Sequence, residues 1–343
     1  MEQISAAIIG AGRIGKLHAD HLIESEDFRL TAIADVFTDH IKDTKYESAA
    51  DYLTHDTETI FKDDRIDAVF ICSSTSTHPQ LIKQAAVSGK HIFCEKPISF
   101  SLKESKEAVD AAKKQNVIFQ VGFNRRFDKH FKKVKDAVFN KKIGEPHIVK
   151  ISSRDPEPPP EAYITTSGGL FMDMTIHDFD MIRFLTGKDV VEIQVNAAQL
   201  VDERFKRTGD VDTAIITVTF SDESIGVIDN SRQAVYGYDQ RIEVFGSEGV
   251  VSADNEATTN VTIQTKEAVT LDHPKYFFLD RYIEAYKEEV RAFASAIKSE
   301  AQVLCSGEDG FKAELLAHAA KKSYEEARKV TIDEIELDLV SEV

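Results

Sequence analysis

The chain has 343 residues, of which 42% are hydrophobic and 29% are charged. These values are typical of a globular protein long enough for two domains, each with a core of its own. The 42 lysines and arginines stand against 59 acidic residues, which gives a formal net charge of −17. So acidic a chain repels nucleic-acid backbones and anionic membrane surfaces, and we expect neither as a partner.

Cysteine usage and hydropathy predict a cytoplasmic protein. The three cysteines, Cys72, Cys94 and Cys305, include no CxxC pair, which favours a reducing compartment. Cys72 and Cys94 lie in apolar runs, where a buried thiol packs as a small hydrophobic group. No apolar run approaches the roughly 20 residues that a membrane span needs, and the first residues lack the pattern of a signal peptide.

The first third of the chain alternates strand and helix patterns. Short apolar runs predict buried strands, and apolar residues at helical spacing predict the helices between them. This order predicts an α/β fold with a doubly wound parallel sheet over residues 1–122. The expected strands are residues 4–10, 28–34, 68–73, 91–94 and 117–122, and the expected helices are residues 13–25, 79–88 and 102–115.

A GxGxxG motif, Gly10-Ala11-Gly12-Arg13-Ile14-Gly15, stands between the first strand and the first helix. Its glycines suit a tight turn, close approach of a pyrophosphate and close helix–strand packing, as in a Rossmann dinucleotide site. Asp35 ends the second strand 20 residues after Gly15. A carboxylate there accepts hydrogen bonds from the ribose of NAD and repels the 2′-phosphate of NADP. We therefore predict NAD as the cofactor; the alternative is a chance glycine turn.

Two further loops follow strands at their carboxyl ends, where such a sheet binds ligands. Lys96, in Glu95-Lys96-Pro97, could reach a substrate hydroxyl or the nicotinamide region, or it could be a surface lysine at the start of a loop. The polar loop of Ser73, Ser74 and Thr75 leads to His78. This loop could contact the nicotinamide ribose or simply cap the next helix.

After about residue 145 the predicted strands become longer and alternate between apolar and polar residues. This pattern predicts an open, mostly antiparallel sheet in a second domain, residues 123–343. A proline-rich loop and a helix over residues 169–185 precede the sheet, and a helical tail over residues 279–329, broken at Gly307 and Gly310, follows it. The expected strands are residues 192–200, 213–220, 225–231, 241–245 and 261–265.

Asp173, His177 and Asp180 follow each other at i, i+4 and i+7, so a helix would place them on one face. A carboxylate one turn from a histidine can orient the ring and stabilise its charged form, which favours His177 as a general base. A buried structural network and a metal site are the alternatives, although no third soft ligand accompanies the pair. The spacing of His18 and His21 likewise resembles that of two metal ligands, but we expect these histidines to lie beside the cofactor crevice or solvent instead.

Taken together, these motifs resemble the Gfo/Idh/MocA oxidoreductase family along nearly the whole chain. Glu95-Lys96-Pro97 followed by a helix with the pattern Asp-x-x-x-His is specific to that family. Within it, residues 153–156, 175–180 and 246–249 are similar to those of inositol 2-dehydrogenases. The resemblance rests on residues 10–15, Asp35, residues 95–97, residues 122–127, Gly168-Gly169 and residues 173–180.

The resemblance implies a Rossmann domain joined to an α/β domain whose open sheet forms a homo-oligomer, commonly a tetramer. The C-terminal helix could pack back on the first domain. No metal ion is implied. The implied catalytic residues, which also contact the substrate, are Lys96, Asp173 and His177. Further substrate contacts would fall on Arg125, Asp155, Asp180 and Tyr236. Contacts to NAD would fall on Gly10, Gly12, Arg13, Ile14, Gly15, Asp35, Ser73, Ser74, Thr75, His78, Glu95 and Lys96.

The implied function is NAD-dependent oxidation of a ring alcohol of a cyclic polyol, in the first place myo-inositol to 2-keto-myo-inositol (scyllo-inosose). His177 would take the hydroxyl proton, Asp173 would stabilise the imidazolium, and Lys96 would hydrogen-bond the reacting oxygen. Another inositol isomer or a sugar is the nearer alternative, since relatives share much of the pattern. A non-catalytic NAD-binding sensor is the more distant one, and the three intact residues disfavour it.

Overall fold

The computed structural model describes residues 3–299 and 302–341. The chain forms two compact units, each built from two separate stretches of sequence. The first unit combines Met1–Phe127 with Glu284–Lys312, and the second combines Asp128–Ile283 with Ala313–Val343. The domain boundary expected after residue 122 stays a prediction.

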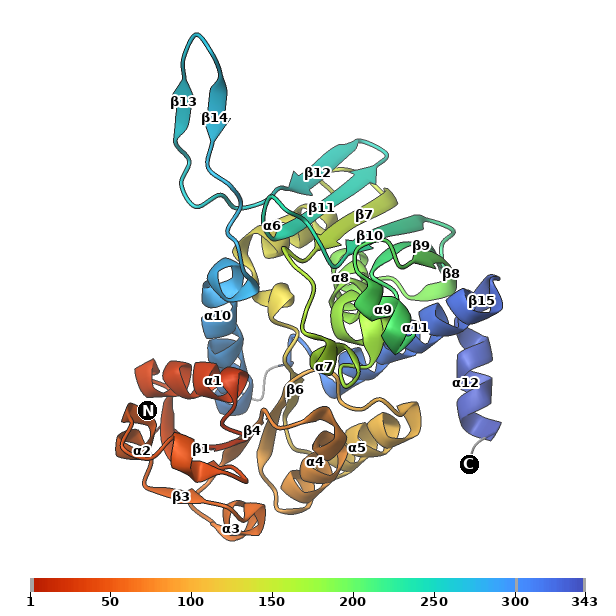
Figure 1. Ribbon diagram of the computed structural model, residues 1–343. Helices are drawn as coiled ribbons and strands as arrows, with labels where there is room; N and C mark the ends of the chain where they lie inside the picture. The colour runs from red at the N-terminus through yellow and green to blue at the C-terminus, as the bar shows by residue number, and fades with distance from the viewer. Residues whose placement is uncertain (1–2, 300–301, 342–343) are drawn as a thin grey trace. The chain divides into compact units, whose positions relative to one another are not determined.

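A parallel sheet in the order β3-β2-β1-β4-β5-β6 forms the centre of the first unit (Figure 1). Its inner strands are apolar along their length because they are buried on both faces, as the fully buried β4 shows. The parallel sheet confirms the fold class expected from the sequence. The strands are β1 (Ile4–Ile9), β2 (Phe28–Ala34), β3 (Tyr52–Thr54), β4 (Ala68–Ile71), β5 (His91–Cys94) and β6 (Phe119–Val121).

Helices connect the parallel strands of the first unit, as crossover connections require. Three of them, α1 (Arg13–Glu24), α4 (His78–Val87) and α5 (Leu102–Lys114), confirm the helices predicted from apolar spacing. The sequence does not indicate β3, α2 and α3, because these short segments lack the continuous apolar run that marks strands such as β4. The remaining helical segments are η1 (Thr38–His40), α2 (Lys45–Ala49), α3 (Thr57–Lys62), η2 (Thr75–Thr77) and η3 (Asn124–Phe127).

Phenylalanine rings fill the core of the first unit. Phe70 and Phe93, from neighbouring strands, stack with their ring centroids 4.9 Å apart. Phe293 of α10 (Phe278–Ser299) packs edge-on against both, at 5.5 and 5.9 Å. Phe293 and Phe70 are fully buried, so the late segment Glu284–Lys312 supplies part of the core around which the N-terminal strands assemble.

The second unit contains a mixed sheet in the order β12-β11-β7-β10-β9-β8-β15. Its neighbours pair antiparallel except β7 and β10, which run parallel, so the mostly antiparallel sheet expected from the sequence is confirmed. A separate hairpin, β13 with β14, extends away from this sheet (Figure 1). The strands are β7 (Pro146–Arg154), β8 (Val190–Ala198), β9 (Thr213–Phe220), β10 (Ile225–Ser231), β11 (Asp239–Gly246), β12 (Gly249–Ala253), β13 (Thr262–Gln264), β14 (Val269–Leu271) and β15 (Val330–Thr331).

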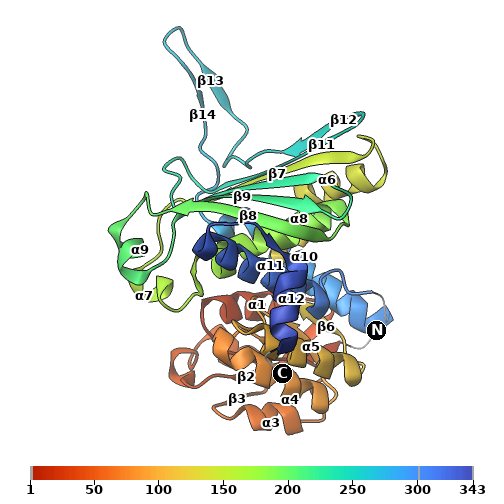
Figure 2. The ribbon, with the colours of Figure 1, turned by 90° about the vertical axis from the view of Figure 1, so that its right-hand side faces the viewer.

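Helices α6 and α8 lie against one face of the mixed sheet (Figure 2). Alternation along the strands sends apolar residues to this face, as in β9, where Ala214, Ile216 and Val218 are buried. The opposite face carries large apolar side chains that are 43–57% exposed: Val191, Ile215, Ile225, Phe245 and Val250. The helical segments of this unit are α6 (Lys129–Phe139), α7 (Glu161–Ile164), a π-helical turn (Phe171–Thr175), α8 (Ile176–Thr186), α9 (Glu203–Thr208) and α12 (Ile332–Ser341).

The C-terminal tail corrects one expectation from the sequence. Gly310 is predicted to break a helix, but α11 (Gly307–Glu326) begins at Gly307 and continues through Gly310. A Cβ atom at Gly310 would lie 2.9 Å from Ile98 Cδ1 and 3.0 Å from Val121 Cγ2. Gly310 therefore allows close packing within the first unit and does not end the helix. No helix within the described ranges combines the length and apolar character that crossing a membrane requires.

Candidate active site

The glycine motif forms the expected turn between β1 and α1. Gly10 has a φ of +95°, and a Cβ atom there would lie 2.6 Å from the backbone nitrogen of Ser73. A Cβ atom on Gly15 would lie 1.9 Å from the carbonyl oxygen of Gly10. Both positions therefore need glycine for the fold itself, one for backbone conformation and strand contact and the other for the approach of helix and strand.

Gly12 differs from its neighbours because a Cβ atom there would meet nothing within 4 Å. It caps α1 without a side-chain hydrogen bond, so the N–H groups of the first helical turn remain available to a ligand. Arg13 is exposed and Ile14 is half-buried at this turn. The open space beside Gly12 fits the approach of a dinucleotide pyrophosphate.

Asp35 directly follows β2 and binds the backbone of the same turn. One carboxylate oxygen accepts a hydrogen bond from the backbone N–H of Ala11 at 2.7 Å, and the other accepts from that of Phe37 at 2.8 Å. Each oxygen keeps a second lone pair, so the carboxylate can still accept hydrogen bonds from ribose hydroxyls. No arginine follows Asp35, and the exposed Val36 and Phe37 offer no charge to a 2′-phosphate. These residues fit NAD.

His78 links the polar loop after β4 to the segment that carries Lys96. It is buried as the first residue of α4, with Nδ1 at 2.8 Å from the carbonyl oxygen of Pro97 and Nε2 at 3.0 Å from that of Ser73. Burial lowers the pKa of its imidazole. Ser73 and Thr77 exchange a hydroxyl hydrogen bond at 2.7 Å, which shapes the loop through Ser74 and Thr75.

Glu95 holds the other side of the Lys96 segment. Its carboxylate lies 2.7 Å from His18 Nε2, and its carboxyl carbon lies 3.1 Å from where a Cβ atom of Gly122 would be. Lys96 itself is half-buried beyond the carboxyl end of β5, followed by a cis peptide bond to Pro97. Lys96 is thus flanked by two residues that buried histidines hold in place.

Arg125 and Arg126 are both buried on η3. Arg126 donates to the carbonyl oxygen of Leu304 at 2.6 Å and to the Asp309 carboxylate at 3.0 Å, so it ties two parts of the first unit together. The substrate role expected for Arg125 stays a prediction.

The helix predicted over residues 169–185 contains a π-helical turn, Phe171–Thr175, before α8 begins at Ile176. The α-helical spacing assumed between Asp173 and His177 therefore does not hold through this turn, and π-helical turns occur frequently at functional sites. Asp173 accepts hydrogen bonds from the Tyr163 hydroxyl at 2.8 Å and from Arg232 Nη2 at 2.8 Å. His177 is half-buried one residue into α8.

Arg232 joins two carboxylates that the sequence analysis assigns to substrate contacts. Its guanidinium donates to Asp155 at 3.0 Å and to Asp173 at 2.8 Å. Burial by itself lowers the pKa of Arg232, but the charges of Asp173 and Asp155 outweigh burial and raise it. Arg232 and Tyr163 could not be predicted from the sequence: Arg232 lies 59 positions from Asp173, and no motif marks Tyr163, ten positions before it.

A buried polar network anchors the segment around His177 to the mixed sheet. Asn230 of β10 donates to Asp178 at 2.8 Å and to the carbonyl oxygen of Ser153 at 3.3 Å, and it accepts from Thr175 at 2.6 Å. These bonds fix both the π-helical turn and the first turn of α8. Asp180, the third residue of the predicted catalytic face, is buried.

Asp210 fixes the start of the π-helical segment. Its carboxylate accepts a hydrogen bond from the backbone N–H of Leu170 at 3.1 Å, and a Cβ atom on Gly169 would lie 2.8 Å from it. Burial raises the pKa of Asp210. Gly168 and Gly169 both have positive φ, so this pair of glycines allows the chain to turn under the carboxylate.

Tyr236 lies in a different hydrogen-bond network of the second unit. Its hydroxyl donates to Asp239 at 2.6 Å and accepts from Arg154 at 3.0 Å. Arg154 also pairs with Asp229. Burial and the bond to Asp239 raise the pKa of Tyr236. The substrate contact expected for Tyr236 stays a prediction.

Comparison with known proteins places these motifs in a family. Residues 4–123 match the oxidoreductase family with an NAD-binding Rossmann fold, and residues 131–252 match the GFO/IDH/MocA C-terminal domain. The chain is 50% identical to the uncharacterized oxidoreductase YrbE of Bacillus subtilis, covering 98% of each chain. The chain belongs to the GFO/IDH/MocA oxidoreductase family.

Two further relatives of this GFO/IDH/MocA protein carry names that specify a substrate. The myo-inositol 2-dehydrogenase of Thermotoga maritima is 48% identical, over 96% of this chain and 98% of the relative. The crystal structure of myo-inositol dehydrogenase from Lactobacillus casei in complex with NAD(H) and myo-inositol is 26% identical, with a TM-score of 0.85 over 96% of this chain and 97% of that one. The family resemblance stated from the motifs is therefore confirmed.

Proposed function

We propose that this chain is an NAD-dependent dehydrogenase that oxidises one ring alcohol of myo-inositol to 2-keto-myo-inositol (scyllo-inosose). The relative named myo-inositol 2-dehydrogenase, nearly half identical along almost the entire chain, is the observation that carries this proposal. The glycine turn, the open space at Gly12 and the acid at Asp35 supply a matching cofactor site.

In the proposed reaction His177 takes the proton of the reacting hydroxyl as general base. Asp173 stabilises the positive charge that His177 then carries, and Lys96 donates a hydrogen bond to the reacting oxygen. NAD⁺, held at the glycine turn and Asp35, would supply the hydride acceptor; the alcohol loses a hydride from its carbon and a proton from its oxygen, and so becomes a ketone. General acid–base assistance of this kind contributes about 10²–10⁴-fold to the rate.

The carboxylates of the second unit suit a polyol. Asp155 and Asp173 are held by Arg232 in fixed positions, yet each carboxylate can accept further hydrogen bonds from hydroxyl groups. With Arg125, Asp180 and Tyr236, they would pair the hydroxyls that do not react. A site that pairs several hydroxyls rejects analogues that lack one, because a buried polar group then loses its partner.

Oligomeric state and compartment belong to the same proposal. The exposed apolar residues on the uncovered face of the mixed sheet support a homotetramer assembled through that face. The three cysteines are unbridged, which supports a reducing cytoplasmic setting. Light scattering after size-exclusion chromatography tests the assembly, and Ile215→Asp should reduce the mass if the sheet forms the interface.

The deciding experiment follows NADH absorbance with NAD⁺ or NADP⁺ and a panel of myo-inositol, scyllo-inositol, D-chiro-inositol, glucose and xylose. Turnover of myo-inositol with NAD⁺, above every other pair, supports the proposal. Preference for another inositol or a sugar replaces the substrate and keeps the cofactor. NAD binding without turnover of any member contradicts the proposed enzyme and favours a sensor.

A further inference from the structure

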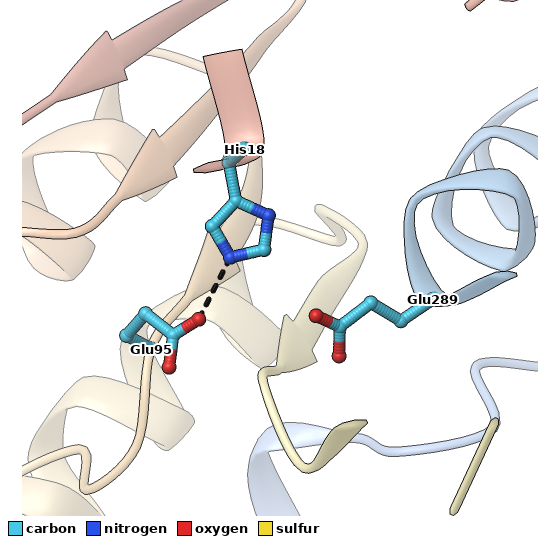
Figure 3. A group of neighbouring side chains, drawn as sticks. All are labelled: His18, Glu95 and Glu289. Atoms are coloured by element: carbon cyan, nitrogen blue, oxygen red, sulfur yellow. Dashed lines mark hydrogen bonds and ion pairs between the residues drawn. The ribbon is translucent and has the colours of Figure 1, made fainter. Parts of the chain in front are cut away.

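Three ionisable side chains from distant parts of the sequence meet inside the first unit (Figure 3). His18 comes from α1, Glu95 follows β5, and Glu289 comes from α10. One nitrogen or oxygen atom of each lies within 4.8 Å of the others. His18 and Glu289 are fully buried, and the Glu95 side chain is 15% exposed.

Glu289 has no use in the mechanism described above. Figure 3 shows its carboxyl group directed toward the His18–Glu95 pair. Neither of its buried oxygens has a hydrogen-bond partner among the described residues. A buried carboxylate without a partner is costly, and such a group takes up a proton or a cation instead.

The groups around the cluster supply little positive charge at neutral pH. Burial, followed by repulsion from His18, lowers the pKa of His21 to about 4, and burial lowers that of His78. Cys72 stays a thiol because burial and the charge of Glu95 raise its pKa. Lys287 directs its ammonium group to Glu24 at 3.5 Å. The other ionisable side chains near the cluster, among the described residues, are those of Cys94 and Tyr286.

Burial and the negative charge of Glu95 both raise the pKa of Glu289 well above its ordinary value. The spacing of the cluster favours a proton over a metal ion. His18 Nε2 and the Glu95 oxygen are 2.7 Å apart, a hydrogen-bond distance. Two ligands of one tetrahedral zinc ion at ordinary bond lengths would lie about 3.3 Å apart.

We propose that Glu289 is a positioning residue for Lys96: its carboxyl group stays neutral beside the His18–Glu95 pair, so that Glu95 keeps its hydrogen bond with His18 and holds the segment Glu95-Lys96-Pro97 in place. Its role rests on the proposed function of Lys96. Glu95 is held on one side by its hydrogen bond with His18, with the Glu289 carboxyl group nearby, and Pro97 is held on the other side by His78. A neutral Glu289 leaves one negative charge in the cluster, which the hydrogen bond from His18 can satisfy.

The first test compares thermal stability with pH for the unsubstituted protein, Glu289→Gln and Glu288→Gln. Glu288 is the neighbouring residue, with a side chain 41% exposed, so it controls for the chemical change. Because folding raises the pKa of Glu289, the stabilisation is complete below the unfolded-state pKa and is lost as pH rises. Glutamine does not ionise, so Glu289→Gln does not lose this stabilisation. The melting temperature of Glu289→Gln minus that of the unsubstituted protein should therefore be at least about 2 °C larger at pH 8 than at pH 5.

The second test measures turnover with NAD⁺ and myo-inositol. Glu289→Ala should lower kcat on the order of 10-fold through misplacement of Lys96, with KM for myo-inositol changed less than twofold. Glu289→Gln, which keeps the shape and a donor group, should restore most of the lost kcat. Loss of turnover that glutamine does not rescue overturns the proposal, since a neutral group would then not suffice.

Two further outcomes overturn the proposal. One is a pH dependence of stability for Glu289→Gln that matches the unsubstituted protein, which means an ionised Glu289. The other is zinc bound at one equivalent per chain after dialysis and lost in Glu289→Gln, which means a metal site. If the unsubstituted protein has no turnover, the proposed function and the positioning role fail together, while the stability test still decides whether Glu289 holds a proton.

Discussion

The glycine turn of the first unit and the carboxylate cluster of the second are built in opposite ways. The turn is built on the absence of side chains: Gly10, Gly12 and Gly15 lie within six consecutive residues, and each leaves a different space. In the cluster, charged side chains that are far apart in the sequence come together. Arg232 meets Asp155 and Asp173 across 77 and 59 residues of sequence.

The two regions should therefore respond differently to substitution. A backbone turn can lose its ligand and remain folded, because the space beside Gly12 is not part of the packing. Removing the buried guanidinium of Arg232 would take the counter-charge from two carboxylates, so we expect its loss to affect folding as well as the proposed substrate site. The predictions below test that separation.

The largest effect should come from removing one catalytic group from either unit. Lys96→Ala and His177→Ala should each lower kcat by about 10²–10⁴-fold, because each removes a group that we propose acts on the reacting hydroxyl. NAD binding, measured by calorimetry, should survive in both. Lys83, whose side chain is 41% exposed, and the exposed His147 provide alanine controls. Turnover near that of the unsubstituted protein in either variant contradicts its assigned role.

Arg232→Ala should destabilise the second unit by about 3–5 kcal/mol, the usual cost of leaving a buried charge without its partner. Urea unfolding followed by circular dichroism measures this loss. Arg207→Ala, which removes an exposed pair with Glu161, should leave the midpoint nearly unchanged. An equally small effect at both arginines would mean that Asp155 and Asp173 do not depend on Arg232.

Gly12→Ala should weaken NAD binding about tenfold, or about 1.4 kcal/mol, and leave the melting temperature in place. The added methyl group enters open space in the protein and obstructs only a ligand. Gly15→Ala is the contrasting variant, because its Cβ atom would collide with the backbone of Gly10 and lower stability. If both variants unfold alike, the two glycines do not have separate roles.

The smallest expected effect concerns cofactor choice. Asp35→Asn should reduce the preference for NAD over NADP about fivefold, since the amide no longer repels a 2′-phosphate. The ratio of kcat/KM values for the two cofactors measures it, with the exposed Asp39→Asn as control. A ratio that does not move would show that the carboxylate serves the turn through Ala11 and Phe37 alone.

The first unit could be predicted well from the sequence because its signals are local. The apolar runs of β1, β2 and β4 and the GxGxxG motif each lie within a few consecutive residues. The short β3 could not be predicted, since three half-buried residues carry no pattern. Likewise, Gly310 was misjudged as a helix break because the close contact that requires it comes from Ile98 and Val121, far away in sequence.

In the second unit, several features of the candidate site depend on residues far apart in the sequence and could not be predicted. Asp173 and His177 could be singled out from their spacing, but the π-helical turn and the partners of Asp173 could not. Strand β7, which leads to Asp155, was missed because Ile148-Val149 and Ser152-Ser153 interrupt its alternation. Arg232 is placed by the parallel pairing of β7 with β10, which is a property of topology.

The position of Phe293 in the core of the first unit has a consequence for biosynthesis. As the ribosome releases the chain from the N-terminus, Phe28, Phe70 and Phe93 emerge 265, 223 and 200 residues before Phe293, the ring that packs among them. The second unit likewise receives its last stretch, Ala313–Val343, after the first unit is complete. The two units alternate along the chain, so a chain that stops before residue 284 completes neither unit, and one that stops directly after Lys312 completes only the first.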